Sequence, residues 1–247
     1  MPLTRRGARR RCARVRIAMR LRVKFEKRGP VRFASHKDVV RIIQRVVATA
    51  GIPVSYTQGY HPHMRMSFGP PLKTGWEGFD EYLDIHCEMP VDKMVERCNE
   101  FMPPGLEFIA CSEVVEGTPK LANDISAAAY RVRVRLDELG SAGKWDADEL
   151  ARTKAEIESR FSRQDGAGEA DPRMVAISAQ TEGRDLRIDY TSTMHSGRVV
   201  PPESVIGLLG ATADLPTPVR VARSAQFIAR NGEFLSPLNE AIIQGMI

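Results

Sequence analysis

The order in which two kinds of apolar periodicity follow one another constrains the fold of this chain more than any other feature. In residues 21–25, Leu21, Val23 and Phe25 alternate with basic residues, as in a strand with one buried face. Over residues 36–50 the apolar residues recur at helical spacing instead, which predicts an amphipathic helix. Strand and helix signals therefore alternate along the chain, which is typical of a mixed α and β protein.

The sequence also predicts where the first helix begins and ends. Ser35 precedes it as a good N-cap, and Asp38 stands three residues later as the partner of an approximate capping box. Gly51 ends the helix, and Pro53 prevents it from resuming. We therefore expect a helix that starts at His36, close to the end of the first strand.

The remaining signals repeat one order of elements in each half of the chain. In the first half, a helix is expected at 90–101 and strands at 54–56, 82–86 and 106–112. In the second half, helices are expected at 148–161 and 202–209, and strands at 130–136, 174–179, 186–191 and 219–228. The order β-α-β-β-α-β in each half is the ferredoxin-like pattern. We therefore expect an α+β protein with two tandem ferredoxin-like (βαββαβ) domains.

The domain limits follow from this order and from a shift in composition. We expect a first domain at 19–113, a polar, small-residue linker at 114–128, and a second domain with a C-terminal tail at 129–247. Residues 1–18 carry seven arginines and no acidic residue, and we expect them to be a disordered extension. This extension is open to interpretation as a nucleic-acid arm, a targeting peptide or a start codon placed too early. We favour the third interpretation, with the true start at Met19.

Charge, apolar runs, cysteine content and glycine motifs exclude several classes of protein. The chain of 247 residues has a net charge of +5, but residues 19–247 alone have a net charge of −2. No apolar run approaches the roughly 18 residues of a membrane span, and no secretory segment is evident. The four cysteines form no C-x-x-C pair, which favours reduced thiols in a cytoplasmic protein. Neither a dinucleotide-binding nor a P-loop glycine motif is present.

The segment between the predicted strands at 54–56 and 82–86 is rich in prolines, glycines and histidines. The order R-F-x-S-H-x-D, A-G-I-P-V, Q-G-Y-x-P-H, M-S-F-G-P-x-L and G-x-E-G-x-x-E-Y-L-D runs through residues 32–84. This order resembles the radical SAM-linked proteins, a family of unknown function whose members are fused to or encoded beside radical S-adenosylmethionine enzymes. The resemblance covers about residues 19–210 and is strongest at 30–85. His61 departs from it, because the family often has Asn or Ser before this proline.

The resemblance implies a partner enzyme rather than a reaction carried out by this chain. Such a partner would use S-adenosylmethionine and an iron–sulfur cluster. This chain has no C-x-x-x-C-x-x-C motif to hold a cluster, so we expect it to bind no cofactor itself. We expect an accessory protein more than an enzyme.

Candidate functional residues gather in the motif segment. Rigid loops on a folded scaffold commonly carry binding, so we expect His36, Gln58, His63 and Arg65 to converge. The other candidates in this group are Gly59 and Glu77. The H-P-H triplet of His61 and His63 supplies too few ligands for a metal site, and we predict none.

Basic and aromatic residues point to RNA as a binding partner. Lys37, Arg41 and Arg45 recur every four residues on one side of the first helix, and Tyr60 and Lys73 extend the set. Basic groups beside exposed aromatic rings are typical of single-stranded RNA binding. The first hypothesis is therefore a protein that presents RNA to a radical SAM enzyme. The alternatives are an adaptor that docks this enzyme without nucleic acid, and a metal-independent endoribonuclease that uses His36 or His63.

Overall fold

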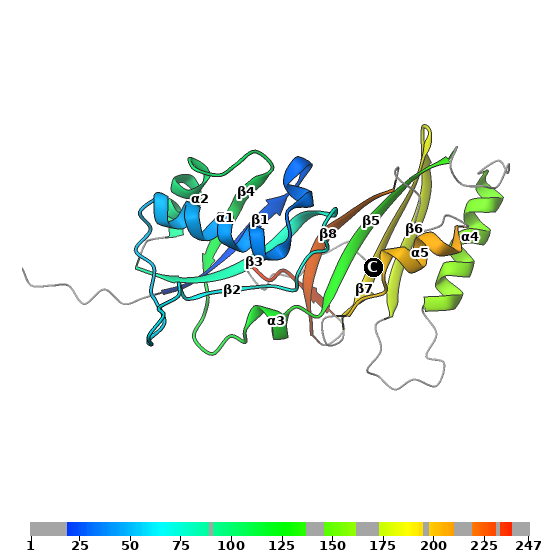
Figure 1. The fold of residues 1–247 in the computed structure, drawn as a ribbon. Coiled ribbons are helices and arrows are strands. Elements are labelled where there is room, and N and C mark those ends of the chain that lie inside the picture. The colour runs from blue at the N-terminus through cyan, green and yellow to red at the C-terminus, as the bar shows by residue number, and fades with distance from the viewer. Residues whose placement is uncertain are drawn as a thin grey trace, which may run out of the picture.

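The computed structural model describes residues 19–88, 91–136, 146–161, 173–194, 198–209, 219–230 and 233–238. Within them the protein is a mixed α+β fold built on one large sheet of nine strands (Figure 1). The strands follow the order β4-β1-β3-β8-β5-β7-β6, with β2 paired to β3 and β9 paired to β8. The expected α+β class is therefore confirmed. None of the helices in the described part of the chain is long and apolar enough to span a membrane.

The first half of the chain forms one end of this sheet. Its elements are β1 (Met19–Lys27), η1 (Gly29–Phe33), α1 (His36–Thr49), β2 (Met66–Phe68), β3 (Glu77–Cys87), α2 (Val91–Asn99) and β4 (Leu106–Glu113). Helices α1 and α2 lie on the same face of the strands (Figure 1). The apolar side of α1 closes the core over Leu21, Val23 and Phe25, the alternating residues of β1.

The second half forms the other end. Its elements are α3 (Leu121–Asp124), β5 (Ala127–Arg135), α4 (Ala147–Phe161), β6 (Met174–Glu182), β7 (Asp185–Thr193), α5 (Pro202–Leu208), β8 (Arg220–Arg230) and β9 (Glu233–Leu235). Ile157 of α4 and Val205 and Ile206 of α5 bury the apolar side chains of β5, β6 and β7 in a second core.

The two halves join through β3 and β8. The start of β3 pairs with β8 in parallel, with Glu77 opposite Ala222. The remainder of β3 pairs with β2 on the same edge, with Phe68 opposite Leu83 and Met66 opposite Ile85. Since β2 and β8 share one edge of β3 end to end, the segment that follows β2 turns away beside the junction of the halves.

Several expected elements differ from the structure. The strand expected at 54–56 is wrong, because Val54 and Tyr56 form only isolated bridges and the paired strand is β2. Within the expected linker at 114–128, α3 packs against the first half through Leu121, which is fully buried. The expected disorder of 1–18 lies outside the described residues.

Candidate functional site

His36 is held at the first position of α1 by the turn that precedes the helix. The Ser35 hydroxyl accepts a hydrogen bond from the backbone N–H of Asp38, whose carboxylate accepts one from the backbone N–H of Ser35. This capping box confirms the sequence-based prediction and fixes the first turn. The His36 ring packs edge-on against Phe68, with 5.7 Å between the two ring centroids.

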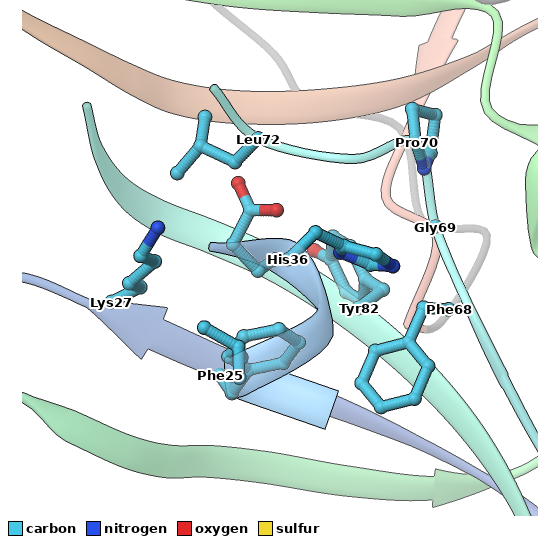
Figure 2. Close-up of a pocket in the computed structure, with 10 residues that line it drawn as sticks. Phe25, Lys27, His36, Phe68, Gly69, Pro70, Leu72 and Tyr82 are labelled. Carbon is cyan, nitrogen blue, oxygen red and sulfur yellow. The ribbon is translucent and has the colours of Figure 1, made fainter. Parts of the chain in front are cut away.

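A small cavity lies where the start of α1 faces the sheet. Its enclosed volume is about 20 Å³, room for about one water molecule, and it is partly open to solvent. Figure 2 shows the His36 ring with Lys27 and Leu72 on one side and Phe68, Gly69 and Pro70 on the other. The motif stretches at 32–38, 66–72 and 77–84 each contribute to the lining, so residues far apart in the sequence meet here.

Lys27 is the cation of this cavity. Only 2% of its surface is exposed, and its ammonium donates a hydrogen bond to the backbone carbonyl of Ala34 at 2.8 Å. It forms no ion pair with any carboxylate in the part of the chain that the structure describes. The hydrogen-bond partner of this buried ammonium is therefore a neutral carbonyl, although the Glu81 carboxylate attracts it through space.

Glu81 is the anion of the cavity, but Arg223 of β8 already compensates its charge. The Arg223 Nε donates to Glu81 Oε1 at 2.8 Å, and both side chains are buried. The same guanidinium donates to the Pro70 carbonyl at 2.7 Å, so the second half of the chain fixes one wall of the cavity. This ion pair joins the two halves at the point where β3 meets β8.

The shape of β3 directs Glu81 into this position. The pairing with β1 shifts by one residue between Phe25 and Lys27, as at a β-bulge. The Glu81 side chain lies over Gly78, where a Cβ atom would stand 2.6 Å from Glu81 Oε1. Gly78 is therefore required for close approach and not for an unusual backbone angle.

Burial sets the protonation of the two basic groups. Burial lowers the pKa of Lys27, while Glu81 raises it and Arg223 lowers it further. Burial also lowers the pKa of His36, with Glu81 opposing this effect and Lys27 and Arg223 adding to it. These effects together favour the neutral imidazole, and neither ring nitrogen has a hydrogen-bond partner among the described residues.

Such an arrangement can hold a small polar group or exchange a proton with it. A neutral imidazole offers one donor and one acceptor, and an ammonium offers three donors. The described residues contain no group of three or more His, Cys, Asp or Glu side chains that could hold a metal ion.

The structure does not bring the other motif candidates to His36. Gln58, Gly59, Tyr60 and His63 lie on an exposed hairpin, in which Tyr56 bridges Met64 and the Thr57 N–H donates to the His63 carbonyl. None of Gln58, His63 and Arg65 lines the cavity beside His36. The expected convergence of His36 with Gln58, His63 and Arg65 is therefore wrong.

The predicted basic row is exposed and borders a groove. Lys37, Arg41 and Arg45 all face solvent on α1, and Arg41 makes only a loose ion pair with Asp38 at 3.4 Å. A groove of about 460 Å³ separates α1 from the segment after α2. Its lining consists of Asp38, Arg41, Ile42, Arg45, Val46, Thr49, Phe101 and Pro103.

Two further candidates have structural partners. Glu77 accepts a hydrogen bond from the Gly29 N–H at 3.0 Å, which ties η1 to β3. Lys73 pairs with Glu203 of α5 and lies over the Trp76 ring, so it connects the halves of the molecule. Neither residue extends the basic row on α1.

Asp84, the last residue of the motif segment, is the centre of a buried charge cluster. Its carboxylate accepts hydrogen bonds from Arg22 and Arg20 of β1, each Nε at 2.9 Å. This cluster lies on the sheet face opposite α1, where Asp124 of α3 also pairs with Arg22.

Lys27 and Arg223, two charged residues at the cavity, were not predicted from the sequence as site residues. Lys27 follows Val23 and Phe25 at intervals of two, so its inward direction was present in the alternation. Arg223 lies 142 residues beyond Glu81, and no local pattern links the two positions.

Comparison with solved structures finds distant likenesses in shape. A chain of a Cbf5–Nop10–Gar1 complex shares 12% identity at a TM-score of 0.41, over 85% of this chain and 49% of that one. A chain of an archaeal box H/ACA sRNP Nop10–Cbf5 complex shares 12% identity at a TM-score of 0.39, and the match covers 85% of this chain and 47% of that one. An unknown protein from Galdieria sulphuraria shares 10% identity at a TM-score of 0.24, and the match covers 83% of this chain and 98% of that one. This chain thus spans about half the length of the first two chains.

Comparison by sequence identifies a family. No curated protein matches the chain. Residues 20–202 match the profile of a family described as "Uncharacterized protein conserved in bacteria (DUF2344)". The match includes the cavity residues of β1, α1 and β3 and extends through β7 to the start of α5. The chain therefore belongs to the DUF2344 family.

Proposed function

We propose that this protein is an RNA-binding accessory protein of a radical SAM enzyme and that it presents RNA for modification. The observation that carries the proposal is the exposed row of Lys37, Arg41 and Arg45 beside the groove of α1. The radical SAM partner rests on the motifs at residues 32–84, which resemble the radical SAM-linked proteins.

The groove has the mixed character that single-stranded RNA requires. Arg41 and Arg45 stand at its edge with side chains that reach solvent, whereas Ile42 and Val46 supply apolar surface. The Phe101 ring is 46% exposed beside them. Cations along a backbone path and an aromatic face for a base are the recurring elements of such binding.

The hairpin at residues 54–65 offers a second contact surface. Tyr60 is 94% exposed and packs edge-on against His61, with 4.8 Å between ring centroids. Arg65 is exposed at the base of the same hairpin. An exposed tyrosine at a loop tip has no role in a core, and its ring is available for stacking on a base.

In this proposal the partner carries out the chemistry. The radical SAM enzyme holds S-adenosylmethionine and the iron–sulfur cluster, and this chain binds no cofactor. The setting is the cytoplasm, where the RNA and the reduced cysteines would be found.

We also propose that the halves are tandem ferredoxin-like units joined edge to edge. The strand orders β4-β1-β3-β2 and β8-β5-β7-β6 support this proposal, because each follows the same path through its half. The helices α1 and α2, and α4 and α5, stand at corresponding places in chain order.

The test is RNA binding by a variant that keeps the fold. The triple variant Lys37→Gln, Arg41→Gln, Arg45→Gln removes three cations from solvent-exposed positions on α1. We expect affinity for a mixed-sequence single-stranded RNA to fall about tenfold or more at low salt, because three phosphate contacts are lost. The slope of log K against log salt should fall by about 2. Fluorescence anisotropy over a salt series measures both quantities.

A matched control removes three basic residues from α4, as Arg152→Gln, Lys154→Gln, Arg160→Gln. This control should bind RNA like the parent. Equal binding by parent and α1 variant would reject the proposal. Failure of the parent to bind RNA, with a radical SAM partner co-purifying after nuclease treatment, would establish the adaptor instead. Cleavage of the RNA that is lost in His36→Ala would establish an endoribonuclease.

A further inference from the structure

The buried ammonium of Lys27 is the starting point. Its side chain is withdrawn from water, with 2% of its surface exposed, and its hydrogen bond goes to the neutral carbonyl of Ala34. Buried charges in proteins are normally compensated by an opposite charge. Among the described residues Lys27 has no such ion pair, although it borders a cavity with room for one more group.

Glu81 does not serve as the missing anion. Its carboxylate lies in the same lining, but Arg223 donates to both of its oxygens and also to the Pro70 carbonyl. At Lys27 the Glu81 carboxylate attracts the ammonium and Arg223 repels it, so this pair offsets the charge of Lys27 only in part. The cavity therefore retains the one positive charge of Lys27.

His36 adds a second group that is free to bind. Its ring borders the same cavity, and neither nitrogen has a hydrogen-bond partner within the described ranges. The rings of Phe25, Phe68 and Tyr82 supply apolar surface to the lining of the cavity. Electrostatic attraction to an entering anion is stronger in such surroundings than in water.

We propose that this cavity binds a single terminal oxyanion group, a carboxylate or a phosphate, through Lys27 and His36. The enclosed volume of about 20 Å³ admits one oxygen-sized group, so the body of the ligand remains at the mouth beside Pro70 and Leu72. The anion pairs with the Lys27 ammonium and accepts a hydrogen bond from His36. The imidazole then takes up a proton from solvent, because an adjacent negative charge favours its charged form.

The site is separate from the RNA-binding groove of the proposed function. The groove lies between α1 and the segment after α2, whereas the cavity lies between the start of α1 and the sheet. Binding of a small oxyanion can therefore be measured without RNA, and either proposal can fail while the other holds.

The test follows the protonation of His36 in the full chain. The ring C–H resonances are recorded by NMR across pH in sodium chloride, sodium acetate and sodium phosphate at equal ionic strength. His36→Gln identifies the His36 signal among the five histidines. The His36 pKa should lie below its usual value in chloride and rise by about one unit or more with the bound anion. A rise in phosphate alone indicates a phosphate ligand, and a rise in both indicates a site that accepts either oxyanion.

Lys27→Met removes the charge and keeps the length of the side chain. In this variant the anion-dependent rise should vanish, whereas Lys93→Met, at an exposed position of α2, should behave like the parent. An unchanged His36 pKa in acetate and phosphate overturns the proposal, as does an equal rise in Lys27→Met. If Lys27→Met does not fold, the comparison of anions in the parent chain still decides the question.

Discussion

Gly78 shows how one residue determines the geometry of the cavity. The position has no steric need for glycine in its backbone angle, yet the Glu81 side chain fills the place of a Cβ atom. This close approach lets Glu81 face Arg223 across the junction of the halves. Gly78 thus allows the buried ion pair between Glu81 and Arg223 to form.

Gly78→Ala should therefore destabilise the protein and disturb the cavity. The added methyl group would stand 2.6 Å from Glu81 Oε1 and would displace the carboxylate from Arg223. We expect a loss of about 1–3 kcal/mol in the free energy of unfolding, the usual cost of overpacking a buried site. Urea denaturation followed by circular dichroism measures it.

Gly207→Ala is the matched control for this substitution. Gly207 lies in α5, and a Cβ atom there would meet no other atom within 4 Å. Alanine should be neutral or should stabilise the helix by up to about 1 kcal/mol. Equal stability of Gly78→Ala and the parent would show that Glu81 moves without cost, and the role given to Gly78 would be wrong.

Prediction of single residues from the sequence succeeded where the information was local. The capping box at Ser35 and Asp38 was predictable because both partners lie within one helical turn. The exposed direction of Arg41 and Arg45 followed from helical spacing. The pairing of Glu81 with Arg223 was not predictable, since it depends on which strand lies next to β3.

At the scale of elements, the hairpin between residues 54 and 65 is the segment that the sequence misplaced. Val54–Tyr56 has strand-like composition, but its pairing is limited to an isolated bridge from Val54 to Cys87 of β3 and another from Tyr56 to Met64 of its own hairpin. Met66–Phe68 pairs with β3 instead, because its alternating apolar residues reach the core under α1. Periodicity predicted the side-chain directions of both segments but could not rank them as partners for β3.

The hairpin tip should be dispensable for folding and required for full RNA binding. The Thr57 N–H and the His63 carbonyl close the loop, so residues 58–62 can be replaced by Asn-Gly, which favours a tight hairpin turn. We expect a change in melting temperature of no more than about 2 °C, because the tip is exposed, and an RNA affinity about threefold or more lower. Thermal melting and fluorescence anisotropy test the two parts.

Tyr60→Ala separates the contribution of the ring from that of the loop. It should reproduce most of the loss in RNA affinity, since stacking on an exposed ring is worth about 1–3 kcal/mol per base. Full RNA affinity in both the shortened loop and Tyr60→Ala would limit the RNA-binding surface to the α1 groove.

At the scale of the whole molecule, one sheet passes through both halves. The backbone pairing between β3 and β8 is short, and the buried pair of Glu81 and Arg223 lies directly beside it. Asp80 adds to the junction, because it accepts a hydrogen bond from the backbone N–H of Gln226 at 2.7 Å. The two halves are therefore joined by strand pairing, a buried ion pair and a buried hydrogen bond as well as by the chain itself.

The halves should consequently unfold together. Replacing one residue of the Glu81–Arg223 pair should destabilise the protein more than replacing both. Calorimetry of the parent should give one transition with a ratio of van't Hoff to calorimetric enthalpy of about one. Glu81→Met or Arg223→Met alone should cost about 3–5 kcal/mol, because each leaves a buried charge without its partner. The double variant should cost much less than the sum, since two apolar side chains of similar length fill the same space. Two separate transitions in the parent would mean that the junction does not couple the halves. Additive losses of stability in the double variant would lead to the same conclusion. The cavity wall at Pro70 would then depend on the first half alone.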